Sequence, residues 1–416
     1  MRETKDIEFK EIVSNSFLKT VSAFANYDGG KIIFGIDDNG IVVGIDNTKR
    51  ACLEIENLIN GNLEPVPSYS LSIDSKYKTV TLSVMEGTEK PYIYKLNAYR
   101  RSDSSTVPVD RTEMKRLILA GQNMSFEELK AENQDLKFDL LTSKIKSELN
   151  VKEFNLDTLK TLELYTDSKG YNKAAELLAD ENIFCGIDIV RFGDSISIIH
   201  DREELKDISI LKMYDESIEM FRKYYKYERI NGAIREDVYL IPEPAFREAI
   251  ANAIVHRTWD IDTNINVAMF PDRIEIVSPG GLPPGINEEE YLRGGISILR
   301  NRIIANIFFR LHMIERFGTG IRRINEEYKD SINKPKFEIT QNSIKITLPL
   351  IDKNKGLSEK QRVVYKVLDH TESSSSMVAE ATGFGKSKTI EILKSLAEEG
   401  YVTVSGNGRG TRYRKK

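Results

Sequence analysis

Apolar and polar residues alternate at helical spacing along the stretch from Phe246 to His256. One stripe of this stretch is apolar and comprises Phe246, Ile250, Ala253 and Ile254. On roughly the opposite side, residues every four positions apart form a polar file of Glu248, Asn252 and His256. The spacing predicts an amphipathic helix that starts at two prolines, and its polar file is either a solvated outer face or a carboxylate and an amide placed for chemistry.

Residues 1–120 show period-two alternation broken by turn signals, which is typical of strands. We expect strands at 31–36, 41–45, 69–73, 79–84 and 98–101, and helices at 17–26 and 111–119. A Gly-Gly turn before the first strand and an Asp-Asp-Asn-Gly turn after it predict a β-hairpin that docks on a helix. The pattern therefore predicts an N-terminal α+β domain.

The next stretch, 121–205, is mainly helical in pattern and rich in Lys and Glu, with strands expected at 188–192 and 195–200 and a helix at 171–182. We interpret it as a helical and α/β connector. Residues 208–225 form a long amphipathic helix whose apolar stripe, Tyr214, Ile218, Phe221 and Tyr225, favours core or dimer packing. This helix opens a central domain over 206–352.

Two glycine-rich stretches follow the Glu248 helix. The strand expected at 273–277 leads into the sequence SPGGLPP, and the sequence FGTGI at 317–321 places two glycines before another helical pattern. Between them, 296–314 carries an apolar helical face of Ile303, Ile304, Ile307, Phe308 and Leu311.

The last sixty residues, 357–416, predict a helix capped by Ser358, a short helix at 377–382, a third helix at 387–399, and two strands at 401–404 and 411–414. Helix, helix, turn, helix and ribbon is the winged helix-turn-helix order. This segment carries 11 Lys and Arg against 7 Asp and Glu, although the whole chain has a net charge of -4. A basic end on an acidic body points to an anionic partner.

Composition limits the remaining possibilities. The chain has 416 residues, of which 40% are hydrophobic and 30% charged, and no apolar run approaches the length of a membrane span. The charged N-terminus lacks a secretory apolar region, so we expect a cytoplasmic location. Cys52 and Cys185 are far apart and only four histidines occur, which disfavours a zinc site.

The helix with Glu248 and Asn252, the strand with its Gly loop and the second Gly loop occur in an order that resembles the GHKL-type ATPase fold, an α/β sandwich. The resemblance implies that Glu248 is the base, that Asn252 holds magnesium, that the first loop binds adenine and that the second wraps the phosphates of ATP. It assigns nucleotide binding to Asn252, His256, Gly280, Gly281, Gly318, Thr319 and Gly320. Ser278 stands where the family usually has an Asp that pairs with the adenine amino group.

The N-terminal motifs EFK, VSAFAN, GG and FGIDDNGIVVGI resemble the Schlafen-type AlbA-like domain over about the first 110 residues. The resemblance implies nucleic-acid binding or, as in the Schlafen ribonucleases, a site for Mg²⁺ or Mn²⁺ at Glu3, Glu8 and Asp38, next to Asp37. Three carboxylates can hold a divalent ion that activates water. The alternative is a solvated acidic strand and an ordinary Asp turn.

Basic residues in the same domain are candidates for a phosphate-binding surface, namely Lys10, Arg100 and Arg101, with Tyr99 and Arg111. In the C-terminal segment, Lys386, Ser387, Lys388 and Thr389 open the third helix and would face DNA. Arg409, Arg412 and Arg414 lie in the expected wing. Some winged domains instead bind protein.

Together these features resemble the helicase-related transcriptional regulators of bacteria, over nearly the whole chain. No GxxxxGK[ST] loop occurs, so the resemblance does not imply helicase activity. We expect a cytoplasmic, dimeric, DNA-binding regulator with an ATP-binding central domain. The alternatives are a metal-dependent nuclease that uses the N-terminal carboxylates, and a central domain that serves only for interaction.

Overall fold

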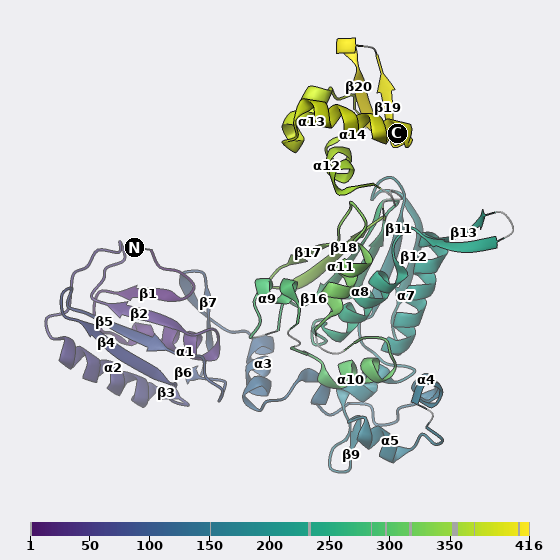
Figure 1. Ribbon diagram of the computed structural model, residues 1–416. Helices are drawn as coiled ribbons and strands as arrows, with labels where there is room; N and C mark the ends of the chain where they lie inside the picture. Colours follow the sequence, from purple (N-terminus) through teal and green to yellow (C-terminus); the bar gives the residue numbers. More distant parts are fainter. Residues whose placement is uncertain are drawn as a thin grey trace. The chain divides into compact units, whose positions relative to one another are not determined.

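The computed structural model describes residues 2–149, 151–231, 234–283, 285–295, 298–315, 318–351, 357–369, 371–406 and 408–415, apart from the side chains of 231, 234, 359 and 409. The chain divides into two compact units, Met1–Leu129 and Lys130–Lys416. Both units mix helices with sheets, which confirms the predicted α+β architecture (Figure 1). No described helix combines the length and apolarity that a membrane crossing requires.

The first unit is built on a four-stranded sheet in the order β1-β2-β5-β4. Strand β1 is parallel to β2, and the other neighbours are antiparallel. Its elements are β1 (Ile7–Lys10), α1 (Leu18–Asn26), β2 (Gly30–Phe34), α2 (Thr48–Asn62), β3 (Leu63–Glu64), β4 (Tyr69–Asp74), β5 (Thr79–Val84), β6 (Ile93–Tyr94), β7 (Tyr99–Ser102), β8 (Ser105–Pro108) and α3 (Arg111–Gly121). Apolar residues of α1, α2, β2 and β5 form the core.

The strand expected at 41–45 is wrong. Both edges of β2 already pair, with β1 on one side and β5 on the other, so a hairpin partner has no edge to join. The segment forms one bridge, between Ile36 and Val42, and separate backbone hydrogen bonds to Gly35 and Lys78 rather than a strand, and Ile41, Val42 and Val43 stay exposed. The turn itself forms, because Asp37 Oδ1 accepts from the backbone N–H groups of Asn39 and Ile41 at 3.0 and 2.8 Å.

The second unit contains a six-stranded sheet in the order β12-β11-β15-β16-β18-β17. Its strands are β11 (Ile187–Phe192), β12 (Ile199–Leu205), β15 (Ile265–Met269), β16 (Arg273–Pro279), β17 (Lys336–Ile339) and β18 (Ser343–Pro349). Strands β11 and β12 precede residue 206, so the sheet of the central domain takes in the end of the stretch expected to be a connector. The second of these strands runs over 199–205 rather than 195–200. We call the part with this sheet, residues 187–351, the central domain.

Helices α7, α8 and α11 lie on one face of this sheet (Figure 1). The helices of the second unit before residue 352 are α4 (Asp139–Leu149), α5 (Leu156–Thr161), α6 (Lys173–Leu178), α7 (Ile210–Tyr225), α8 (Glu243–Val255), α9 (Glu288–Arg293), α10 (Arg302–Arg310) and α11 (Gly320–Glu327). The aromatic stripe of α7 is core rather than an exposed dimer face, since Phe221 stacks on Phe246 of α8 with ring centroids 4.5 Å apart.

Two short hairpins complete the elements before residue 352, β9 (Tyr165–Thr166) with β10 (Gly170–Tyr171), and β13 (Lys226–Asn231) with β14 (Ile234–Tyr239). Residues 357–416 contain α12 (Glu359–Val367), α13 (Ser375–Thr382), α14 (Lys386–Glu398), β19 (Val402–Ser405) and β20 (Arg412–Lys415). Ser358 caps α12 through a capping box with Gln361. Strands β19 and β20 pair antiparallel, and Tyr413 also bridges Ser373 before α13. The three helices enclose a small core of their own with β19 and β20.

Candidate nucleotide-binding pocket

The polar side of α8, with Glu248, Asn252 and His256, faces the inside of the domain rather than solvent. Glu248 is only 7% exposed, and Asn252 and His256 are half-buried. The reason is that α8 packs against the sheet on one side and against α11 on the other. The solvated-face alternative is therefore wrong, and the acid and the amide point into the domain.

Glu248 and Asn252 meet the second glycine loop. The Asn252 Nδ2 atom donates to Glu248 Oε1 at 3.1 Å. A Cβ atom at Gly320 would stand 2.5 Å from Glu248 Oε1 and 2.6 Å from Asn252 Nδ2. A side chain at this position would have to displace these two polar groups, so the glycine lets the loop backbone lie against them, and residues about seventy positions apart in the sequence form one site.

The environment of Glu248 suits a base. Burial raises the pKa of its carboxyl, while the hydrogen bond from Asn252 and the nearby Arg323 charge oppose that rise. A carboxylate with a raised pKa binds a proton more readily at neutral pH. Because Glu248 lies beside the Gly318–Gly320 turn, its carboxyl is close to any ligand bound at that turn.

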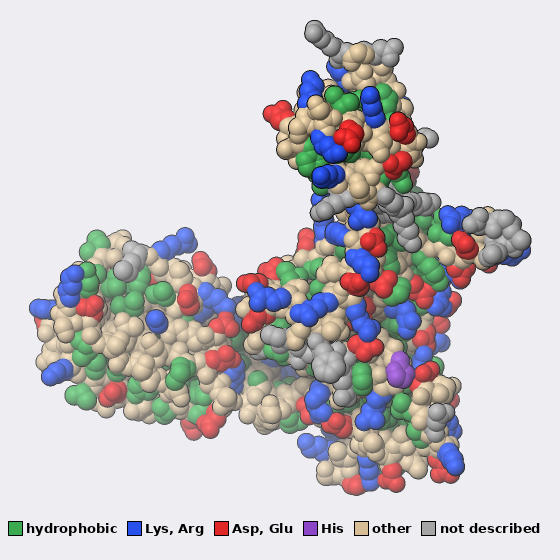
Figure 2. Space-filling view, in the orientation of Figure 1, with side chains coloured by type: hydrophobic (Ala, Val, Ile, Leu, Met, Phe, Trp, Pro, Cys, Tyr) green, Lys and Arg blue, Asp and Glu red, His purple; other side chains and the backbone are tan. Residues whose placement is uncertain are grey.

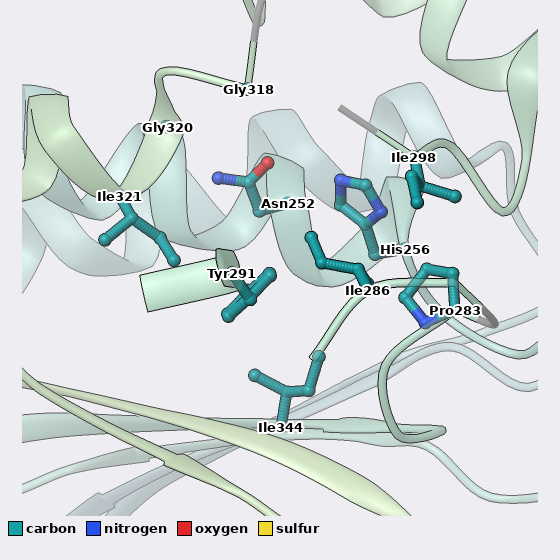
Figure 3. Close-up of a pocket in the computed structure, with 10 residues that line it drawn as sticks. All are labelled: Asn252, His256, Pro283, Ile286, Tyr291, Ile298, Gly318, Gly320, Ile321 and Ile344. Atoms are coloured by element: carbon teal, nitrogen blue, oxygen red, sulfur yellow. The ribbon is translucent and has the colours of Figure 1, made fainter. Parts of the chain in front are cut away.

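A cavity of about 60 Å³ lies between α8, α9 and the glycine loop (Figure 3). Its lining residues are Asn252, His256, Pro283, Ile286, Tyr291, Ile298, Gly318, Gly320, Ile321 and Ile344. A second cavity of about 10 Å³ shares Asn252, His256, Tyr291 and Ile344 and reaches Ser278 at the end of β16. We call the two together the central pocket.

Ser278 lies in the wall of this pocket, where the family resemblance places the residue that meets adenine. The side chain is buried, and its hydroxyl donates to the Ala253 carbonyl of α8 at 2.8 Å. Its proton is thereby used within the protein. The lone pairs of Ser278 Oγ remain, so this position can accept a hydrogen bond but has no second proton to donate.

His256 ends α8 and also lines the pocket. Burial, with a smaller effect from the Arg300 guanidinium, lowers the pKa of His256 to about 4. The imidazole is therefore neutral at physiological pH and can donate from one nitrogen and accept at the other.

Among its described residues, the first glycine loop lines the pocket through Ser278 and Pro283, and not through Gly280 or Gly281 as expected. A Cβ atom at Gly280 would stand 2.0 Å from Thr258 Oγ1, and one at Gly281 would stand 2.4 Å from the Gln341 carbonyl. These glycines let the loop pack tightly on its neighbours, and neither occurs in the walls of the two cavities. Thr319 does not line the cavities either, whereas Gly318 and Gly320 do. Phe317 and Pro284 lie outside the described residues.

In the first unit, Glu8 is buried and fully engaged. It forms ion pairs with Arg101 and, at 2.8 Å, with Lys10, and Thr20 Oγ1 donates to it at 2.6 Å. Glu3 accepts from the backbone N–H of Phe9 at 2.8 Å. Asp38 is exposed on its turn.

These carboxylates do not assemble into the expected metal set. Across the described residues, which include Glu3, Glu8 and Asp38, no three His, Cys, Asp or Glu side chains are grouped to hold a metal ion. The physical reason at Glu8 is that two cationic side chains already neutralise it.

The expected phosphate surface of this unit is also occupied by internal contacts. Arg101 is 4% exposed, and besides its pair with Glu8 it donates to Thr106 Oγ1 at 2.9 Å and to the Thr4 carbonyl at 3.0 Å. Arg100 pairs with Glu113 at 3.1 Å. Arg101 therefore supports the fold, which corrects its expected role as a surface residue.

Two family models match the chain. Residues 3–110 match the family described as "Schlafen, AlbA_2", and residues 262–348 match the one described as "Putative ATP-dependent DNA helicase recG C-terminal". The chain thus carries a Schlafen AlbA_2 domain and a RecG C-terminal domain. The second match begins after α8 and spans β15, β16, β17, nearly all of β18 and both glycine-rich stretches, whereas β11 and β12 lie outside it.

Two solved structures are similar to the chain. One is the DIP2311 protein from Corynebacterium diphtheriae, with 18% identity, a TM-score of 0.48, and coverage of 99% of this chain and 92% of that chain. The other is the N-terminal domain of a RecG-related protein, described as a putative ATP-dependent DNA helicase, from Nitrosomonas europaea. It has 27% identity and a TM-score of 0.20, and the match covers 27% of this chain and 85% of that chain. No curated protein matches the sequence.

C-terminal to the RecG C-terminal domain, the expected DNA-contacting residues differ in exposure. Lys386, Ser387, Lys388 and Arg414 are exposed, and Arg412 is half-buried. Thr389 is fully buried and its hydroxyl donates to the Gly385 carbonyl at 3.2 Å, so it anchors the start of α14 and cannot contact DNA. The side chain of Arg409 lies outside the described residues.

Sequence reasoning missed three residues in and around α9 that line the pocket. Tyr291 of α9 lines both cavities, and Ile286 and Ile298, before and after this helix, line the larger one. The helix itself had a signal, because Asn287 and Glu290 form a capping box. Nothing in the local sequence shows that Tyr291 turns toward α8.

Proposed function

We propose that the RecG C-terminal domain and α8 together bind an adenine nucleotide with Mg²⁺, and that the chain is a nucleotide-responsive DNA-binding regulator. The observation that carries the proposal is the contact of Glu248 and Asn252 with the Gly318–Gly320 turn, because it joins an acid, an amide and a glycine backbone at one pocket.

The donor set fits a nucleotide and its cation. Asn252 uses Nδ2 for Glu248, so its Oδ1 remains for a hard cation, which prefers oxygen ligands. Gly318 and Gly320 present backbone at the start of α11, where N–H groups and the helix dipole favour phosphate. Bound Mg²⁺ would supply charge neutralisation for the phosphates. The raised pKa of the Glu248 carboxyl suits it to accept a proton from a water molecule.

The pocket wall also supports a base with an amino group. Ser278 Oγ donates its hydrogen bond to the Ala253 carbonyl, so its lone pairs offer an acceptor to the exocyclic amine of adenine. The neutral His256 ring offers one donor and one acceptor nearby. Apolar walls from Ile276, Ile344 and Ile346 suit the flat faces of a purine.

The C-terminal segment supports DNA binding. Three helices and a hairpin occur in winged-helix order, and the bridge between Ser373 and Tyr413 places a short strand segment before α13 against the hairpin. Lys386, Lys388 and Lys394 are exposed along α14, and Arg414 is exposed on β20. Figure 2 shows both basic and acidic side chains on the visible face of this segment. Phosphate contacts from such cations provide sequence-independent affinity.

The nuclease alternative finds less support in the same geometry. Glu8 forms ion pairs with Lys10 and Arg101, which is expected if this carboxylate stabilises the fold instead of binding a metal. Glu3 accepts a hydrogen bond from the Phe9 backbone N–H. We therefore rank regulation above metal-dependent cleavage.

Mg-ATP at millimolar concentration should raise the melting temperature of the full-length protein, because a ligand that binds only the native state stabilises it. Asn252→Ala should abolish this rise, since it removes both the cation ligand and the partner of Glu248. Asn325→Ala, at an exposed asparagine of α11, is the matched control and should keep the rise. A melting temperature that Mg-ATP leaves unchanged in the wild type would favour a nucleotide-free interaction domain.

Replacing Lys386, Lys388, Arg409 and Arg412 by Ala should weaken DNA binding and reduce its salt dependence by roughly one unit of slope per lost phosphate contact. Affinity measured by fluorescence anisotropy at several salt concentrations gives both quantities. The control is Lys360→Ala with Lys366→Ala, two exposed lysines on α12. If the quadruple variant bound DNA as the wild type does, these residues would lie outside the interface.

A further inference from the structure

The central pocket is too small for a nucleotide as it stands. Its two cavities measure about 60 and 10 Å³, whereas pockets that bind small molecules usually offer roughly 300 Å³ or more. The proposed function therefore requires that a segment lining the pocket move away and so enlarge the cavity. The described wall residues come from α8, from β16 and β18 of the sheet, from the Gly318–Gly320 turn with α11, and from Pro283, Ile286, Tyr291 and Ile298 in and around α9.

The side chain that fills the pocket is Tyr291. It is the α9 residue that lines both cavities, between Asn252 on one side and Ile344 on the other (Figure 3). Burial raises the pKa of its hydroxyl to about 12. Within the described part of the chain this hydroxyl has no hydrogen-bond partner, so packing alone holds the ring. A planar ring next to Ser278 and His256 occupies the place proposed for the base.

Helix α9 is suited to move. Its residues are exposed or, like Tyr291, only half-buried, and glycines with positive φ flank it, Gly285 at 85°, Gly294 at 64° and Gly295 at 100°. Segments with few buried contacts open at low cost compared with the core. The α8 and sheet walls, in contrast, belong to the core.

Arg322 holds this segment in place. Its Nε donates to the Arg293 carbonyl at 3.0 Å and its Nη2 to the Gly294 carbonyl at 2.9 Å, both at the end of α9. The fit depends on glycine, because a Cβ atom at Gly295 would stand 3.0 Å from Arg322 Nη2. Gly295 N–H also donates to the Gly318 carbonyl at 3.0 Å, which ties α9 to the glycine turn.

The partners of Arg322 are unusual for an exposed guanidinium. Among the described residues it meets only carbonyl oxygens, whereas Arg293 and Arg323 pair with Glu289 and Glu315. Arg322 lies two residues after Gly320, in the first turn of α11. If α9 moved away from the pocket, the Arg322 guanidinium would lose its hydrogen bonds to the Arg293 and Gly294 carbonyls. It would then lie unpaired beside the Gly318–Gly320 turn, which is the proposed phosphate site. An ionic phosphate oxygen is a stronger acceptor for arginine than a carbonyl.

From these contacts, and resting on the proposed function, we infer that Tyr291 is a built-in plug of the nucleotide pocket and that Arg322 exchanges the α9 carbonyls for a nucleotide phosphate when the plug leaves. Nucleoside di- and triphosphates are the ligand class, because only they provide both a base for the Tyr291 position and phosphates for Arg322. The apparent affinity of the wild type is then reduced by the fraction of time for which the plug is in place.

The test is a titration of full-length protein with Mg-ATP and, separately, with adenosine. Tyr291→Ala should tighten binding of both ligands, by about tenfold if the plug is in place nine-tenths of the time. Tyr291→Phe is the matched control and should bind as the wild type does, since the hydroxyl has no partner to lose among the described residues. Thermal melting of each variant establishes that it is folded.

Arg322 is tested in the Tyr291→Ala background, where loss of its hold on α9 no longer matters. Arg322→Gln should weaken Mg-ATP binding about tenfold or more and leave adenosine binding unchanged, because only ATP brings an ionic acceptor. Arg322→Lys should restore part of the loss, and Arg293→Gln, at an exposed arginine of α9, should have no effect.

The outcomes separate the two proposals. Mg-ATP binding that depends on Asn252 but is no tighter in Tyr291→Ala would overturn the plug and leave the proposed function intact. Equal weakening of ATP and adenosine by Arg322→Gln would assign Arg322 a structural role only. If a folded Tyr291→Ala variant bound neither ligand, the proposed nucleotide site itself would fail.

Discussion

Replacing Arg257 by Met is expected to destabilise the central domain by about 3 kcal/mol or more, a large part of the stability of an ordinary domain. Arg257 follows α8 and is fully buried. Its guanidinium donates to the carbonyls of Cys185, Ile261 and Thr263 at 3.0, 3.0 and 2.5 Å, and it stacks 4.4 Å from the Trp259 ring centroid. It therefore joins the segments that lead into β11 and β15.

Methionine fills a similar volume but leaves these buried carbonyls without a donor, and each such group costs about 1–3 kcal/mol. Urea unfolding of the full chain, followed by tryptophan fluorescence, suits the measurement because Trp259 is the only tryptophan. The control is Arg202→Met, which removes an exposed ion pair with Asp188 and should cost about 1 kcal/mol or less. Similar losses in the two variants would contradict a supporting role for Arg257.

Glu8→Gln is expected to destabilise the Schlafen AlbA_2 domain by a similar amount, about 3–5 kcal/mol. Glu8 is 5% exposed and its carboxylate balances Arg101, whose side chain is 4% exposed. The amide keeps the shape but leaves a buried guanidinium without its counter-charge. Thermal melting of the full chain measures the loss, and adding Arg101→Met to Glu8→Gln should recover part of it.

Glu3→Gln is the matched control, since an amide oxygen can still accept from the Phe9 N–H. It should leave stability nearly unchanged. The nuclease alternative predicts a different pattern, in which both substitutions abolish cleavage, Mn²⁺ stabilises the wild type and a chelator destabilises it. Metal-dependent degradation of RNA by the wild type, lost in a stable Glu8→Gln variant, would reverse the ranking of the two functions.

The sequence was most informative where one periodicity extended over a whole element. The helices α7 and α8 and the capped α12 lie where their apolar spacing or cap predicted. Helix α2 was missed although Asn47 caps it and Ala51, Ile55 and Ile59 recur every four residues. The segment 41–45 failed for a different reason, because its apolar alternation cannot show that β2 already has two partners.

In the candidate site, too, local features were predictable and contacts between distant residues were not. The helical file of Glu248 and Asn252 and the glycine turn at Gly318 and Gly320 are local features that the sequence shows, whereas their place in one site was expected from the resemblance to the GHKL-type fold. The packing of Gly280 and Gly281, the burial of Arg101 and the position of Tyr291 depend on neighbours far away in sequence. Local patterns carry no information about such contacts.

Calorimetric titration of the full-length protein with Mg-ATP tests the nucleotide site most directly. We predict saturable binding of one nucleotide per chain, lost in Asn252→Ala and retained in Glu248→Gln, whose amide keeps the contact with Asn252 but cannot accept a proton. Absence of binding to both the wild type and Tyr291→Ala, or equal binding to the wild type and Asn252→Ala, would contradict the account.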